Sequence, residues 1–213
     1  MARISKGILG GFSGKVGTVV GFNWRGIDVM RSVPKKGNRI PTSKQAEVQA
    51  QFTLTAHFLN PIKPILSDYF GQPSAEKSRY NLAFAYHNRE AIIGTYPDYE
   101  IDYPKVIITK GELLGLQQPL VTADAGAVLN FAWDDNSGEG EAKTTDQVLV
   151  VVYNPARELF AYITQAATRV DRAYQYDLPD NWVGDTVHVW TSVADAEGKK
   201  CASSLYLGSV VLV

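Results

Sequence analysis

Residues that could carry out chemistry are few in this sequence and widely spaced. Gly14 and Lys15 are the residue types that end a phosphate-binding loop, but that motif needs a glycine five positions before the pair and a Ser or Thr after it. This chain has Leu9 and Val16 at those positions. We therefore expect the glycines to form turns that let backbone segments approach closely, and we predict no cofactor.

The histidines and the cysteine do not form a recognisable catalytic or metal-binding pattern. His57 and His87 fall in helical segments without a serine or cysteine nucleophile nearby, and His188 falls in a strand. Cys201 has no neighbour in sequence that would activate its thiol, so we expect a small, semi-buried residue. Structural roles are predicted for all four, with no catalytic residue and no small-molecule substrate.

An acidic loop, "WDDNSGEGE", is the one stretch with enough carboxylates for calcium. Its spacing does not match the EF-hand loop, so a solvated loop is expected and no metal site is predicted. The carboxylates concerned are Asp134, Asp135, Glu139 and Glu141.

The most unusual stretch is a glycine-rich segment near the N-terminus that combines basic and aromatic residues. Trp and Arg are favoured anchors of protein interfaces, but aromatic rings beside cations also suit single-stranded nucleic acid, where bases stack and phosphates are neutralised. A third reading is a basic surface hairpin that packs on its own domain. The predicted interaction residues are Phe12, Lys15, Phe22, Trp24, Arg25, Arg31, Lys35, Lys36 and Arg39.

Charge is separated along the chain, although the net charge is only −1. Residues 1–44 hold nine Lys or Arg and one acid, a net +8, whereas the remaining residues hold 12 basic and 21 acidic side chains, a net −9. An acidic body would repel nucleic acid but attract the basic segment of another copy. The charge pattern therefore favours a protein partner.

Composition is that of a globular protein: 213 residues, 45% hydrophobic and 20% charged. No apolar run is long enough to span a membrane, and glycines interrupt the N-terminus before a signal peptide could form. The single cysteine excludes an internal disulfide framework. We expect synthesis in the cytoplasm without a signal peptide, and an assembled product such as a virion could be released from the cell.

Three segments with different hydrophobic periods follow one another. Residues 1–41 are predicted to form a basic β-hairpin arm, with Val20, Phe22 and Trp24 on one face and a turn at Arg25-Gly26. Such a two-stranded ribbon is too small to be stable alone and must dock on something.

Residues 42–95 are predicted to form a helical block. Thr42 and Gln45 have the spacing of a capping box, Asn60-Pro61 interrupts the first helix, and Ser74 is expected to cap a third helix.

Residues 100–213 alternate with the period of strands, and seven short strands in about 110 residues suggest a β-sandwich. Leu129, Phe131 and Trp133 are expected to face Val187, Val189 and Val193 across its core. The predicted fold class is α+β: an arm, a small helical block and a C-terminal Ig-like antiparallel sandwich. The expected strands are 105–113, 127–135, 146–154, 158–165, 172–179, 185–195 and 202–213.

Two resemblances extend this interpretation. The stretch "LPDNWVGDTVHVWTSVADAEGKKCASSLY" resembles the end of fibronectin type III or immunoglobulin-like domains, without the immunoglobulin cysteine pair. "GGFSGKVGTVVGFNWRGIDVMRS", "PTSKQAEVQAQF" and "YLGSV" resemble, over nearly the full length, an uncharacterised bacterial family classed as a domain of unknown function. That resemblance implies no activity.

The function expected from the sequence is a non-enzymatic structural protein that self-assembles. The arm of one copy would dock on the acidic body of the next, giving a homo-oligomer, ring or filament, as in a virion or phage-tail-like component. The alternative is a nucleic-acid-binding module that uses the basic, aromatic arm.

Overall fold

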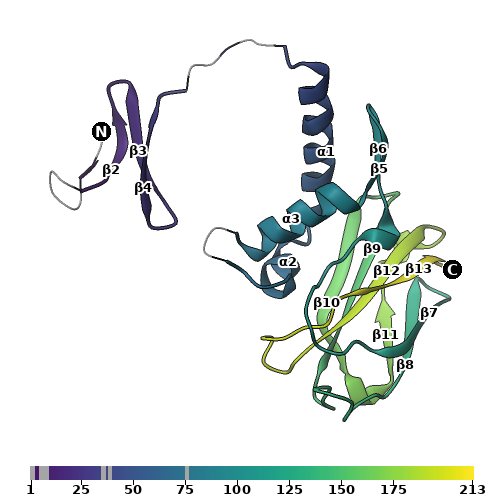
Figure 1. Ribbon diagram of the computed structural model, residues 1–213. Helices are drawn as coiled ribbons and strands as arrows, with labels where there is room; N and C mark the ends of the chain where they lie inside the picture. The colour runs from purple at the N-terminus through teal and green to yellow at the C-terminus, as the bar shows by residue number, and fades with distance from the viewer. Residues whose placement is uncertain (1–2, 5–9, 35–36, 38–39, 75–76) are drawn as a thin grey trace. The chain divides into compact units, whose positions relative to one another are not determined.

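The computed structural model (Figure 1) describes residues 3–4, 10–34, 37, 40–74 and 77–213. The chain divides into two compact units, residues 1–43 and 44–213, which we call the arm and the body and describe separately. The arm boundary expected from the sequence was residue 41. Lys35, Lys36 and Arg39 lie outside the described residues.

The arm is a small antiparallel sheet in the order β1-β2-β3-β4, with strands β1 Arg3–Ile4, β2 Phe12–Val16, β3 Val19–Trp24 and β4 Ile27–Ser32. The predicted hairpin is β3–β4, and its turn is at the expected place. Arg25 and Gly26 both have positive φ, 52° and 86°, as a type I′ turn requires. The sequence did not predict β1 and β2, because short glycine-rich strands carry almost no alternation of their own.

Three helices open the body: α1 Ser43–Leu59, α2 Lys63–Tyr69 and α3 Arg79–Glu90. α1 begins directly after Thr42, and Pro61 follows its end, as predicted. The cap of α3 was wrongly predicted. Ser78, not Ser74, lies at its N-cap, where its Oγ accepts a hydrogen bond from the Asn81 amide at 3.2 Å.

Two antiparallel sheets form the sandwich. One has the order β10-β9-β12-β13 and the other β11-β8-β7. A separate hairpin, β5 Ile92–Thr95 with β6 Asp98–Ile101, follows α3, and short 3-10 turns lie at Tyr103–Lys105, Arg169–Asp171 and Asp180–Trp182. The sandwich strands are β7 Gln117–Asp124, β8 Val128–Asp134, β9 Gln147–Asn154, β10 Leu159–Thr168, β11 Ala173–Asp177, β12 Thr186–Ala194 and β13 Leu205–Val211.

In the body, one strand prediction was wrong and three strands were missed. Residues 105–113 do not form a strand; they cross the body as an irregular segment that buries Val106 and Ile108 and makes single bridges from Lys110 and Leu113. The first strand of the sandwich is instead β7, which was missed because its sequence is weakly polar. The β5–β6 hairpin was also not predicted. The other six predicted strands correspond to β8–β13.

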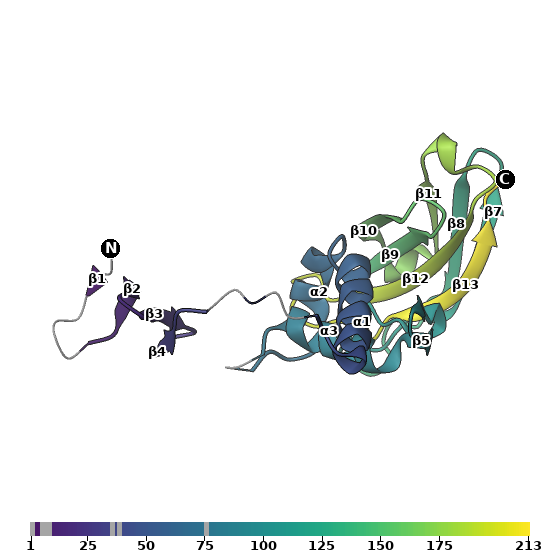
Figure 2. The ribbon, with the colours of Figure 1, turned by 90° about the horizontal axis from the view of Figure 1, so that it is seen from above.

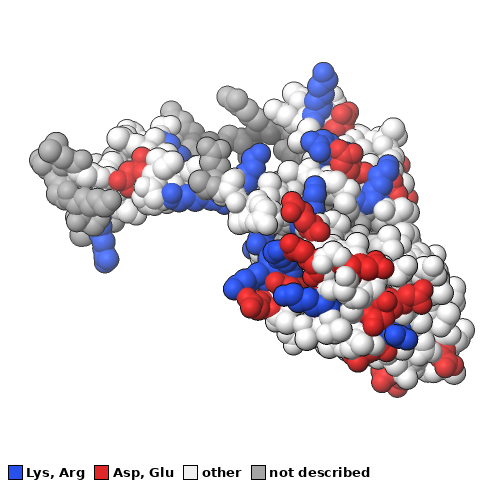
Figure 3. Space-filling model, turned by 60° about the horizontal axis from the view of Figure 1, so that its bottom comes forward, with Lys and Arg blue, Asp and Glu red and all other residues white. Residues whose placement is uncertain are grey.

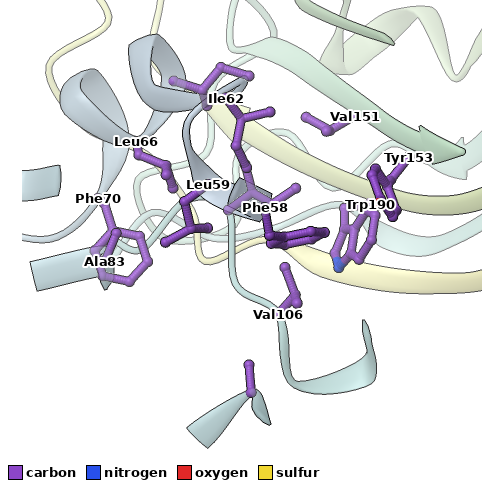
Figure 4. Packing of buried hydrophobic residues seen from close by; sticks show 13 residues of the cluster. Phe58, Leu59, Ile62, Leu66, Phe70, Ala83, Val106, Val151, Tyr153 and Trp190 are labelled. Atoms are coloured by element: carbon purple, nitrogen blue, oxygen red, sulfur yellow. The ribbon is translucent and has the colours of Figure 1, made fainter. Parts of the chain in front are cut away.

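The body has three layers, with helices on one face of the four-stranded sheet and the three-stranded sheet on the other (Figure 2). The core between the sheets contains Leu129, Phe131, Trp133, Val187 and Val189, as predicted. Val193, which was predicted with them, is instead buried in a separate cluster with Leu113 and Ala202. A second core lies between the helices and the four-stranded sheet, where the helical side chains meet those of the strands (Figure 4). The predicted helical block and the sandwich thus share a core within one compact unit.

A buried ion pair joins the loops at one end of the sandwich. Arg169 is fully buried, and its guanidinium lies 3.1 Å from the Asp146 carboxylate. The same guanidinium donates to the Leu114 and Gly115 carbonyls and to Asn136 Oδ1. Because these partners come from the segment before β7 and from the loop between β8 and β9, one side chain ties both to the turn that follows β10.

Candidate interaction surface

Most of the predicted interaction residues that the structure describes lie on one face of the arm. Side chains alternate between the two faces of a strand, so the strand register shows which residues share a face. Lys15 pairs with Val20, and Val20 pairs with Arg31; Phe22 pairs with Val29, and Trp24 with Ile27. We call this set the Trp24 face: Lys15, Val20, Phe22, Trp24, Ile27, Val29 and Arg31.

The Trp24 face is an apolar stripe with cations along it. The Arg31 guanidinium lies 5.3 Å from the centre of the Phe22 ring, and that of Arg25, in the turn, lies 5.6 Å from the Trp24 ring. Both distances suit cation–π attraction. Trp24 is 48% exposed and Ile27 59% exposed. A large apolar area is therefore presented together with basic groups.

Phe12 does not join this surface. A Cβ at Gly21 would lie 2.3 Å from the Phe12 carbonyl oxygen and 2.7 Å from its ring, so the chain at Phe12 packs directly over Gly21 on the opposite face. That face also carries the Asn23–Asp28 hydrogen bond, 2.9 Å long. The role predicted for Phe12 becomes a structural one, since it holds β2 against β3 where only glycine leaves room.

The described part of the arm has no hydrophobic core of its own. Gly21 is the only buried residue among the arm residues whose exposure the structure describes. A single sheet of short strands is marginally stable in water unless another layer covers its apolar face. The Trp24 face is thus suited to contact a second surface.

The body carries an acidic sheet face that the sequence did not reveal. We call it the outer face: the residues of β7, β8 and β11 that point away from the sandwich core. It bears three aspartates and no Lys or Arg. Its members are Leu120, Thr122, Asp124, Val128, Asn130, Ala132, Asp134, Ala173, Gln175 and Asp177. The face went unrecognised because β7 was not predicted.

The body is not acidic everywhere. A cleft of about 430 Å³ beside the β12–β13 loop is lined by Arg79, Lys110, Lys199 and Lys200, with Glu112 and Glu141. Lys200 pairs with Glu141 at 2.6 Å, while the Lys110 ammonium lies 5.6 Å from the centre of the Tyr86 ring. Figure 3 shows both signs of charge intermixed on the visible face of the body. The net charge of the body therefore conceals distinct local surfaces.

Two histidines have structural surroundings. His87 is buried, with Nδ1 2.8 Å from the Ala83 carbonyl and Nε2 accepting the Ile107 amide at 3.3 Å. Burial lowers its pKa to about 4, so the ring is neutral at physiological pH. His188 stacks on Tyr103 at 3.8 Å, and burial lowers its pKa as well.

The remaining candidates for chemistry lie in separate places. His57 is exposed, 4.0 Å from Glu158. Burial raises the pKa of the Cys201 thiol, which donates to the Tyr69 carbonyl. In the acidic loop, Asp135 accepts from Ser137 and Glu141 pairs with Lys200. No group of three metal-binding side chains occurs in the described ranges, and no helix there is long and apolar enough to cross a membrane.

Comparisons with known proteins bear on family and fold. Residues 11–208 match a family described as a family of unknown function, DUF6266. No curated protein matches the sequence. One similar structure is the fn3 domain of the human collagen alpha-1(XX) chain, at 10% identity and a TM-score of 0.34, covering 46% of this chain and 85% of that one. Another is the FN1-FN3 domains of chicken CNTN1, at 6% identity and 0.30, covering 45% and 31%.

Proposed function

The chain belongs to the family of unknown function DUF6266, and we propose that it is a non-enzymatic structural protein whose copies assemble through the arm. The observation that carries the proposal is the uncovered Trp24 face. Its apolar residues are exposed or half-buried, and the arm residues that the structure describes form a single layer. Trp and Arg, which anchor many protein interfaces, both occur at this face.

Charge supports a second copy as the partner. Residues 1–44 carry a net charge of +8 and the remaining residues a net charge of −9, so the arm of one molecule is attracted to the body of another. Such a contact is heterologous, because it joins two different surfaces. It produces a ring where the rotation between copies closes, and a filament where it does not. A virion or phage-tail-like particle is the setting we propose, by analogy of fold.

Replacement of Trp24 by alanine tests this function. We expect Trp24→Ala to abolish assembled species in sedimentation velocity at low salt while circular dichroism shows an intact body. The matched control is Met30→Ala, because Met30 is an exposed apolar residue, 67% exposed, on the opposite face of the same sheet. If Trp24→Ala instead lowers the melting temperature of a protein that is already monomeric, the arm packs on its own body and the proposal is wrong.

A nucleic-acid-binding module is the second candidate, and the alternation of aromatic rings and cations on the Trp24 face favours it. Exposed rings can stack on bases while Lys and Arg contact phosphates. Binding of this kind weakens steeply with salt, because each phosphate contact releases a counterion. We expect little binding of a single-stranded oligonucleotide at about 150 mM salt. Sub-micromolar affinity in fluorescence anisotropy at that salt would favour this function over assembly.

A further inference from the structure

Across the arm sheet, one row of residues has a cation at each end and a valine in the middle. Lys15 on β2, Val20 on β3 and Arg31 on β4 are register partners, so they form a single row on the Trp24 face. Lys15 and Arg31 are exposed, and neither forms an ion pair with a residue that the structure describes. Neighbouring strands lie about 4.8 Å apart, which separates the two cationic strands by about 10 Å.

The outer face of the body carries a similar row, with a valine in the middle and an acidic residue at each end. Asp124 on β7, Val128 on β8 and Asp177 on β11 are register partners. Both aspartates are exposed, and neither pairs with a described Lys or Arg. The two acidic strands flank β8 in an antiparallel sheet, as the cationic strands β2 and β4 flank β3 in the arm, so the separation is the same in both sheets.

The rows that follow the charged rows also have side chains of complementary size on the two faces. On the Trp24 face, the second row beyond Lys15 and Arg31 contains Trp24 and Ile27. Two rows from the aspartates, the outer face presents Ala132 and Ala173 in register with Leu120, which is 67% exposed. Large side chains facing small ones allow two sheets to interdigitate at the usual separation of about 10 Å.

We infer that the outer face of the three-stranded sheet is the acceptor for the Trp24 face of a second copy, with Lys15 and Arg31 against Asp124 and Asp177. The inference rests on the proposed assembly and names the surface that receives the arm. In this contact Val20 lies against Val128 between the charge pairs. Trp24 covers Ala132 and Ala173. The intervening row, Phe22 with Val29, lies against Asn130 and its register partners Thr122 and Gln175.

Charge reversal in the full chain tests this pairing. The arm variant is Lys15→Glu with Arg31→Glu, and the acceptor variant is Asp124→Lys with Asp177→Lys. Like charges placed opposite one another destabilise a contact, so we expect each variant to weaken assembly at least about tenfold in sedimentation velocity. The chain with all four reversals restores opposite charges, and we expect it to assemble again. A mixture of the two double variants should also assemble.

A matched control reverses acids elsewhere on the body. Asp98→Lys with Glu100→Lys changes two exposed carboxylates on the β5–β6 hairpin by the same total charge, and it should leave assembly unchanged. Wild-type assembly that survives in the acceptor variant, or fails to return in the fourfold variant, would show that the outer face is not the acceptor while leaving the proposed function standing. A wild-type chain that stays monomeric overturns both.

Discussion

At the scale of single residues, exposure distinguishes the arm from the body. Trp24 has a ring whose burial is worth up to about 3 kcal/mol, yet about half of it faces solvent. In the body, Trp133, Trp182 and Trp190 are all buried. The uncovered tryptophan belongs to the unit whose described residues form no core, which is why we propose that it lies at an interface.

Replacement of Arg169 is expected to lower the stability of the body. Arg169→Met removes the partner of a buried carboxylate, and uncompensated buried charge is costly, so we expect the free energy of unfolding to fall by about 3–5 kcal/mol. The control is Arg157→Met, whose partner Asp185 is 2.7 Å away but partly exposed; we expect a loss of about 1 kcal/mol or less. Urea unfolding followed by fluorescence measures both. Equal losses in the two variants would contradict the structural role given to Arg169.

At the scale of elements, alternation of apolar and polar residues marks a strand most clearly where one face of the strand meets water. β8 alternates buried and half-exposed residues and was predicted within one residue of its observed ends. β9 reads as a continuous apolar run because helices cover one face of its sheet and the second sheet covers the other. The segment 105–113 has the same apolar character, but its Val106 and Ile108 fill the core between layers without pairing along a strand.

The interaction surface was predictable in composition but not in arrangement. The sequence identified Phe22, Trp24 and Arg31 by residue type and alternation. It did not separate Phe12 from them, because the contact of Phe12 with Gly21 depends on β2 pairing with β3. The outer face required the register of three strands that are distant in sequence, and no local pattern encodes that register.

The contact of His87 on α3 with the irregular segment 105–113 predicts that the stability of the protein depends on pH. His87 has a pKa of about 4 in the folded protein against 6.5 in the unfolded chain. The unfolded state therefore binds more protons between these values, and the free energy of unfolding falls as pH falls from 6.5 to 4. The His87 contribution lost is on the order of 3 kcal/mol.

The measurement is urea unfolding from pH 7 to 4, in the Trp24→Ala background so that assembly does not contribute. His87→Gln should flatten the pH dependence, because the amide does not titrate. His188→Gln is the comparison, since the pKa of His188 is also lowered and its protonation acts in the same direction. A His87→Gln curve as steep as that of the parent would contradict a buried neutral ring.

At the scale of the whole molecule, the proposed assembly depends on two surfaces of opposite charge on one chain. Attraction between exposed charges is screened beyond about 10 Å at 0.1 M salt, so assembly driven by the arm is expected to be strongest at low ionic strength. Salt does not screen the apolar contacts of the Trp24 face. Assembly should therefore weaken with salt without disappearing at once.

Electron microscopy of the purified full chain at low salt tests the central claim most directly. We expect filaments or closed rings of repeating bodies, and their loss in a chain carrying Trp24→Ala. Uniform single particles of monomer size, over a wide range of protein and salt concentration, would contradict assembly through the arm.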